Sequence, residues 1–217
     1  MRERIDAACD RAGRSREDVR LVAISKTKPA ADVLSAADAG QTLFGENRVQ
    51  EALGKQAEIS ADFEWHLVGP LQRNKARHAV GAFALLHGVD NSRLVDEIDR
   101  RAEAAGTTQR LLLQVRLGGE ATKFGVDPEG LAALLDHALG CENVEVRGLM
   151  TIPPPVECPD DARRWFAELC EIREAHMMRA GVPMPELSMG MTSDFEVAIE
   201  EGATIVRVGT ALFGPRG

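Results

Sequence analysis

The chain has 217 residues, enough for one full-sized domain or two small ones with a substantial core. Its 44% hydrophobic and 28% charged residues are ordinary for a globular protein. The 34 acidic and 26 basic side chains give a net charge of -8, which argues against a general affinity for nucleic acid or anionic membranes. No stretch reaches the roughly 18 apolar residues of a membrane span, and the charged N-terminus does not resemble a signal peptide, so we expect a cytoplasmic protein.

The first apolar run, residues 21–24, leads into Ser25 and Lys26, and Pro29 follows. An uninterrupted run of this kind is typical of a strand buried on both faces of a parallel sheet. We expect this strand at about 20–25, ended by Pro29, which offers no N–H to a neighbouring strand. Lys26 is thereby placed at the carboxyl end of the strand, the edge at which α/β folds gather their chemistry. A solvated lysine at a strand end is the ordinary alternative.

The rest of the chain alternates short apolar runs with helical patterns, several of which end at a glycine. Strands are predicted at about 20–25, 42–45, 63–68, 83–87, 110–116, 144–150, 186–189 and 204–208. Helices are predicted at about 1–13, 30–39, 46–59, 72–79, 92–105, 128–139, 160–180 and 193–201.

This alternation runs over residues 1–217 without a linker or a change of composition, which indicates a single α/β domain. Strict alternation implies a parallel sheet with right-handed crossovers. Eight repeats in about 200 residues imply closure into a (β/α)8 TIM barrel. An open doubly wound sheet is the alternative, but the glycine-rich GxGxxG turn is missing after the first strand.

Closure would bring the last strand beside the first, so that their carboxyl ends meet at one rim. The loops after the seventh and eighth strands, residues 188–194 and 209–214, contain glycines and hydroxyl side chains. In this fold these two loops are a common phosphate site, because glycine lets the backbone approach an anion and helix N-termini favour negative charge. Ordinary turn and capping chemistry would explain either loop alone.

A phosphate site beside Lys26 suits a phosphorylated aldehyde or ketone held as an imine, and two or three strand spacings of about 4.8 Å would accommodate a pyridoxal ring. A neutral amine is needed for this chemistry, and Lys28 is a candidate source of the nearby positive charge that favours it. Arg207 lies within the eighth apolar strand, two residues before Gly209. It either forms an ion pair with a carboxylate or faces the pyridine nitrogen of pyridoxal phosphate, where its charge would make the cofactor a weak electron sink.

The sequence resembles the family of small pyridoxal phosphate homeostasis proteins and is similar to the N-terminal barrel domain of bacterial alanine racemases. Seven motifs carry this resemblance in the family's order, and together they cover nearly the whole chain. They are VAISKTKP at 22–29, FGENRVQE at 44–51, WHLVGPLQRNK at 65–75, KFG at 123–125, GLMT at 148–151, LSMGMTSD at 187–194 and VRVGTALFG at 206–214.

The resemblance implies that Lys26 carries the imine to pyridoxal 5'-phosphate and that Arg207 faces the ring nitrogen. It also implies a phosphate cup formed by five residues of the last two loops, namely Ser188, Gly190, Thr192, Gly209 and Thr210. Three more positions match residues expected near the cofactor, namely Asn47, His66 and Met150.

Two positions depart from the family pattern. Arg48 stands where the family more often has tyrosine or phenylalanine, and Pro70 follows the WHLVG motif. Both departures concern the surroundings of the ring and leave the lysine and phosphate positions in place.

Alanine racemases add a second, β-rich domain that contributes a tyrosine base on the face opposite the lysine. This sequence ends just past the last predicted strand and contains no tyrosine, so we expect neither that domain nor that base. His66 or His87 is a candidate substitute, although a lone histidine in a strand is more often a packed residue. Because a second acid–base group contributes about 10²–10⁴-fold, Lys26 alone should racemise amino acids slowly at most.

We therefore expect a carrier that holds and delivers pyridoxal phosphate and, as the resemblance implies, serves vitamin B6 and amino-acid homeostasis without dedicated catalysis. A weak amino-acid racemase with Lys26 as its catalytic base is the first alternative. A class I aldolase acting on a sugar phosphate is another, although its lysine usually lies on a middle strand.

The expected partners are pyridoxal phosphate and the pyridoxal-phosphate-dependent apoenzymes that would receive it. Nucleic acid, membranes and metal ions are not expected; the four scattered cysteines show no metal-binding spacing. The missing second domain removes one dimer interface, which favours a monomer.

Overall fold

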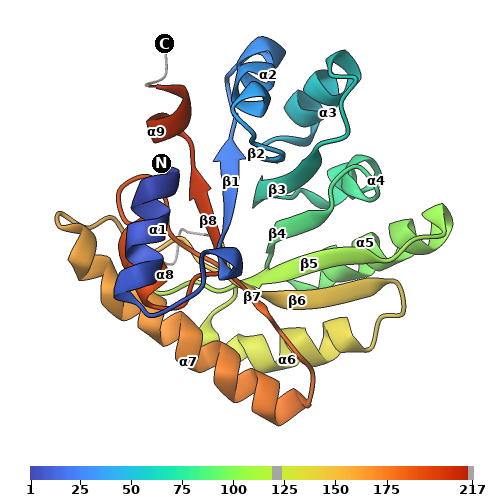
Figure 1. Ribbon diagram of the computed structural model, residues 1–217. Coiled ribbons are helices and arrows are strands. Elements are labelled where there is room, and N and C mark those ends of the chain that lie inside the picture. Colours follow the sequence, from blue (N-terminus) through green and yellow to red (C-terminus); the bar gives the residue numbers. More distant parts are fainter. Residues whose placement is uncertain (119–123, 215–217) are drawn as a thin grey trace.

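The protein is a closed barrel of parallel strands, and this computed structural model describes residues 1–118 and 124–214. The strands follow one another around the barrel in sequence order, and β1 closes the ring by pairing with β8. Figure 1 shows the helices arranged around the outside of the strands. The predicted (β/α)8 barrel is confirmed. Within the described ranges, no helix combines the length and the apolar character that crossing a bilayer requires.

The strands are β1 (Arg20–Ile24), β2 (Leu43–Glu46), β3 (Glu64–Pro70), β4 (Leu85–Val89), β5 (Gln109–Gln114), β6 (Val144–Met150), β7 (Glu186–Ser188) and β8 (Ile205–Val208). The α-helices are α1 (Arg2–Arg11), α2 (Ala30–Asp38), α3 (Val49–Glu58), α4 (Ala76–Ala79), α5 (Ser92–Ala105), α6 (Pro128–Leu139), α7 (Arg163–Ala180), α8 (Phe195–Glu200) and α9 (Thr210–Phe213). Short 3-10 helices among the described residues are η1 (Arg16–Asp18), η2 (Arg73–Lys75) and η3 (Pro159–Ala162).

Several predicted strand ends were wrong by one or two residues, including those of β4 and β5, which end at Val89 and Gln114 instead of at residues 87 and 116. β1 ends at Ile24, because the chain turns at residues 25–28, and Pro29 instead precedes the first residue of α2. β3 does not stop at residue 68; it continues through Gly69 to Pro70, which pairs with Gly88 across a register shift. The predicted helix at 72–79 is a 3-10 turn followed by the single turn of α4.

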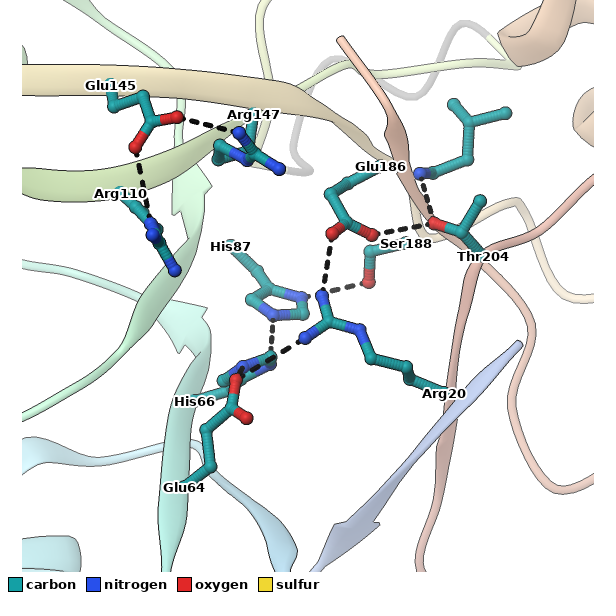
Figure 2. A network of polar contacts seen from close by, with 11 residues as sticks. Arg20, Glu64, His66, His87, Arg110, Glu145, Arg147, Glu186, Ser188 and Thr204 are labelled. Carbon is teal, nitrogen blue, oxygen red and sulfur yellow. Dashed lines mark hydrogen bonds and ion pairs between the residues drawn. The ribbon is translucent and has the colours of Figure 1, made fainter. Parts of the chain in front are cut away.

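The barrel interior combines apolar and polar side chains. Its apolar cluster consists of Val22, Leu43, Val68, Leu85, Leu112, Met150 and Ile205. The mouth at the N-terminal ends of the strands is charged instead: Arg20 lies 2.8 Å from Glu186 and 3.4 Å from Glu64, as Figure 2 shows. Glu145 accepts hydrogen bonds from Arg110 and Arg147 beside them.

A buried ion cluster supports the turn that carries Lys26. The Nζ atom of Lys55 on α3 lies 2.5 Å from Glu46 of β2 and 2.9 Å from Glu51, and it donates a 2.6 Å hydrogen bond to the carbonyl of Ser25. The Ser25 hydroxyl donates to the same Glu46 oxygen at 2.6 Å. Glu51 also accepts from the backbone N–H of Thr27. Thus α3 and β2 together fix the end of β1.

A second close contact joins β6 to β7. A Cβ added at Gly148 would lie 1.9 Å from the carbonyl oxygen of Glu186, so only glycine permits this strand spacing. Glu186 is two residues from Ser188 on β7. The glycine therefore sets the position of side chains that reach the barrel interior.

We expect Gly148→Ala to lower the free energy of unfolding by several kcal/mol, on the order of 3, because the backbone of β7 must move to admit the methyl group. Gly54→Ala is the control: Gly54 is exposed within α3 and has nothing within 4 Å of an added Cβ. That change should raise the free energy of unfolding by up to about 1 kcal/mol. Urea unfolding followed by circular dichroism measures both, and equal midpoints for the two variants would contradict the close contact.

We expect Lys55→Met to destabilise the protein by about 3–5 kcal/mol, because it leaves Glu46 fully buried without its counter-charge. Arg100→Met, which removes the exposed pair with Glu97, should leave the urea midpoint nearly unchanged. The Lys55 variant should also show faster amide hydrogen exchange at Thr27, whose N–H loses an ordered acceptor. Unaltered exchange there would argue against the supporting role.

Candidate functional site

A cavity of about 420 Å³ lies at the carboxyl ends of the strands, where β1 meets β8. Its polar wall consists of Lys26, Asn47, Thr192, Ser193, Arg207, Gly209 and Thr210. Its apolar wall consists of Ile24, Val68, Ile152 and Met191. Larger hollows, of about 770 and 800 Å³, lie elsewhere on the molecule. We place the functional site in the smaller cavity because it brings a lysine, a guanidinium and several hydroxyls together.

Lys26 occupies a tight turn and is partly buried. The N–H of Lys28 donates to the carbonyl of Ser25 at 3.0 Å, and Thr27 between them has a φ of 65°. A β-branched residue in this region is strained by about 1–3 kcal/mol. Glu51 and the buried ion cluster hold the strained turn, so the amine of Lys26 is presented by a fixed backbone.

Arg207 reaches the cavity from β8 and is 4% exposed. Its guanidinium donates to the Ser188 hydroxyl at 2.6 Å and to the Thr151 carbonyl at 2.9 Å. The hydrogen-bond partners described for Arg207 are therefore neutral, and they are not the carboxylate that one sequence interpretation expected. Burial lowers the pKa of Arg207 to about 10, and Asp194 opposes this shift, so the guanidinium stays charged at neutral pH.

The two predicted phosphate loops meet at the same cavity. Thr192 and Ser193 precede α8, while Gly209 and Thr210 begin α9. Asp194 accepts a 2.6 Å hydrogen bond from the N–H of Met191 and so closes the first loop. Hydroxyl groups and the N-terminus of α9 on the cavity wall favour an anion.

The structure brings six of the predicted site residues to the cavity wall, namely Lys26, Asn47, Thr192, Arg207, Gly209 and Thr210. The other four lie behind it. The Ser188 hydroxyl is engaged by Arg207 and His87, and the Gly190 carbonyl accepts from the N–H of Arg207. Met150 belongs to the apolar barrel interior, and His66 is buried between Glu64 and His87.

Sequence reasoning missed Ile24, Val68, Ile152, Met191 and Ser193. Ile24 and Val68 stand two residues from Lys26 and His66, so the two-residue alternation of a strand was a usable signal for both. Ile152 and the loop residues carry no comparable signal, because their direction depends on how the loops fold.

A separate group of metal-ligating side chains lies on the outer surface. Asp96 of α5, His137 of α6 and Cys141 place their ligand atoms within 4.8 Å of one another. Asp96 and His137 already share a 2.6 Å hydrogen bond, which accounts for their proximity. Sequence spacing could not show this group, because it spans two helices.

The match to known proteins extends over the whole chain. The family described as "Alanine racemase, N-terminal domain" matches residues 1–217. The pyridoxal phosphate homeostasis protein of Aquifex aeolicus is 48% identical over 99% of this chain and 94% of its own length. That of Pseudomonas aeruginosa is 44% identical over 98% of this chain and 91% of its own length.

Solved structures agree with the sequence relatives. PipY of Synechococcus elongatus, solved with PLP bound, superposes with a TM-score of 0.87 at 41% identity, covering 97% of this chain and 100% of that one. An alanine racemase of Clostridium difficile has a TM-score of 0.74 at 12% identity, which shows a common fold alone. The chain thus belongs to the alanine racemase N-terminal domain family and, within it, to the pyridoxal phosphate homeostasis proteins.

Proposed function

We propose that this chain binds pyridoxal 5'-phosphate in the 420 Å³ cavity, holds it as an imine on Lys26, and serves vitamin B6 and amino-acid homeostasis. The observation that carries the proposal is the presence of Lys26, Arg207 and two hydroxyl-bearing loops on the walls of one cavity. The names of the relatives and the PLP-bound PipY structure support the same ligand.

The donor set fits each part of this cofactor. Thr192, Ser193 and Thr210, with the starts of α8 and α9, suit a phosphate. The apolar wall formed by Ile24, Val68, Ile152 and Met191 suits the two faces of a pyridine ring. Lys26 suits an aldehyde, because an imine forms when a neutral amine condenses with a carbonyl and water leaves.

Arg207 determines what a bound pyridine ring would be able to do. Its buried guanidinium can only donate hydrogen bonds, and it carries a permanent charge at neutral pH. When bound, the cofactor supplies an electrophilic carbon and an electron sink, and a cation at its ring nitrogen weakens the sink. Transamination and decarboxylation are therefore disfavoured.

The composition of the cavity wall supports a carrier rather than a dedicated enzyme. Apart from Lys26, the described lining residues include no histidine, tyrosine or carboxylate that would serve as a second acid–base group. His66 and His87, the sequence candidates for that role, hydrogen-bond to each other in the barrel interior. Transfer to pyridoxal-phosphate-dependent apoenzymes and a monomeric state stay predictions from the sequence.

We expect the wild-type protein to take up pyridoxal phosphate with a near-visible absorption band, and Lys26→Ala to lack that band. Borohydride reduction followed by peptide mass spectrometry should locate the label on Lys26. Lys75→Ala is the control, because Lys75 lies outside the cavity wall. Labelling of another lysine in the wild type, or an unchanged band in Lys26→Ala, would overturn the assignment.

We expect the loaded protein to racemise alanine and serine about 10²–10⁴-fold more slowly than a two-base enzyme, because one acid–base group is missing. Chiral chromatography of long incubations measures this rate, and Lys26→Ala gives the background. Turnover at about 10 s⁻¹, typical of enzymes, would favour the racemase. A colourless protein that cleaves sugar phosphates would favour the aldolase.

A further inference from the structure

Five side chains connect the two ends of the barrel through its interior. Glu64 lies 2.8 Å from His66, which lies 3.0 Å from His87. His87 lies 2.9 Å from the hydroxyl of Ser188, which accepts from Arg207 at 2.6 Å. Figure 2 shows four of these side chains, namely Glu64, His66, His87 and Ser188. Parallel barrels usually fill this space with apolar side chains, so a continuous polar path needs an explanation.

The path joins two hollows at opposite ends of the barrel. Glu64 lines a hollow of about 800 Å³ beside the N-terminal ends of β3, β4 and β5, and its side chain is 44% exposed. Arg207 lines the cofactor cavity at the other mouth. His66, His87 and Ser188 between them are fully buried.

The direction of every hydrogen bond follows from the two ends. A guanidinium can only donate and a carboxylate can only accept. Glu64 must therefore receive the Nε2–H of His66, which leaves Nδ1 of a neutral His66 as an acceptor for the Nε2–H of His87. Nδ1 of a neutral His87 then accepts the Ser188 hydroxyl proton, and the Ser188 oxygen keeps a lone pair for Arg207. With both imidazoles neutral, every donor of the path meets an acceptor, including the Ser188 hydroxyl.

We propose that Glu64, His66, His87 and Ser188 form a one-way hydrogen-bond chain whose two neutral Nε2–H imidazoles position the guanidinium of Arg207 for the cofactor. The positioning of Arg207 for the cofactor rests on the proposed function, whereas the hydrogen-bond chain is a property of the protein without ligand. A proton added to either imidazole leaves one donor of the path without an acceptor and releases Ser188 from its orientation.

The charges around the path agree with neutral imidazoles. Burial lowers the pKa of His66, and the positive charge of Arg20 acts in the same direction. Glu64 and Glu186 partly oppose this shift. Burial lowers the pKa of His87 well below its ordinary value, and His66, Arg207 and Arg20 act in the same direction. The hydrogen bond from His66 lowers the pKa of Glu64, which keeps the terminal acceptor ionised.

The first test is nitrogen-15 NMR of the apoprotein at neutral pH, with ring signals assigned through His66→Gln and His87→Gln. We expect two neutral rings, each protonated at Nε2. An imidazolium, or an Nδ1–H tautomer at either ring, would contradict the proposed hydrogen-bond chain. No cofactor is present, so this outcome does not depend on whether pyridoxal phosphate is the ligand.

The second test is Ser188→Ala, which removes the link between His87 and Arg207. We expect the Nδ1 signal of His87 to move to that of an acceptor without a donor, and the Kd for pyridoxal phosphate to rise about 10-fold. Ser35→Ala, at an exposed residue of α2, should change neither the His87 signal nor the Kd. An unchanged His87 signal would contradict the hydrogen-bond chain. A changed signal with an unchanged Kd for pyridoxal phosphate would contradict the positioning of Arg207 by this chain. Failure of the wild type to bind would instead overturn the proposed function.

The third test is the pH dependence of unfolding of the apoprotein. An unfolded imidazole takes up a proton near the ordinary pKa of 6.5, whereas the folded pKa of both rings is lower. The unfolded state then binds more protons as the pH falls below 6.5, so the free energy of unfolding should fall with it. His87→Gln should flatten this slope, and His78→Gln, at an exposed residue, should keep it. Equal slopes in wild type and His87→Gln would contradict neutral burial.

Discussion

Pairing between the first and the last strand is the constraint on which the site depends. Val22 of β1 is in register with Arg207 of β8, and Ala23 with Val208. Because the strands are parallel, the residues that follow them leave the barrel at the same rim. Lys26 and the loop at Gly209 are separated by almost the whole chain in sequence, yet barrel closure makes them walls of one cavity. An open sheet built from the same strands would leave them at opposite edges.

Burying a guanidinium at that rim imposes a second constraint, since a buried charge is costly unless its hydrogen bonds are satisfied. A carboxylate partner would neutralise Arg207 and would compete for the ligand. The barrel uses a hydroxyl and a carbonyl instead. These neutral acceptors leave the positive charge available to the cavity. The negative charge that favours the charged guanidinium is that of Asp194, which is not among its described hydrogen-bond partners. Glu64 at the other mouth is connected to Arg207 only through two histidines and a serine.

The sequence was sufficient for the barrel, for the position of Lys26 and for most of the cavity wall. Strand–helix alternation determines topology when no linker interrupts it, and the rim residues follow from strand order. The sequence did not show the interior contacts of Ser188 and His66. The interior contacts of both residues depend on the register between neighbouring strands, and that register shifts between β3 and β4. A single sequence does not contain the register, so it does not show the hydrogen bonds that Ser188 forms with His87 and Arg207.

The directed character of the polar path restricts how this barrel can evolve. Replacing one member by an apolar residue leaves its neighbour buried with an unmatched donor or acceptor, which costs more than losing the whole path. Substitutions at Glu64, His66, His87 and Ser188 are therefore tolerated together rather than singly. Relatives should inherit the four positions as a block, and a lineage with an apolar interior should have exchanged all of them. Divergence at these positions is then a concerted event, in contrast to the independent drift of the surface helices.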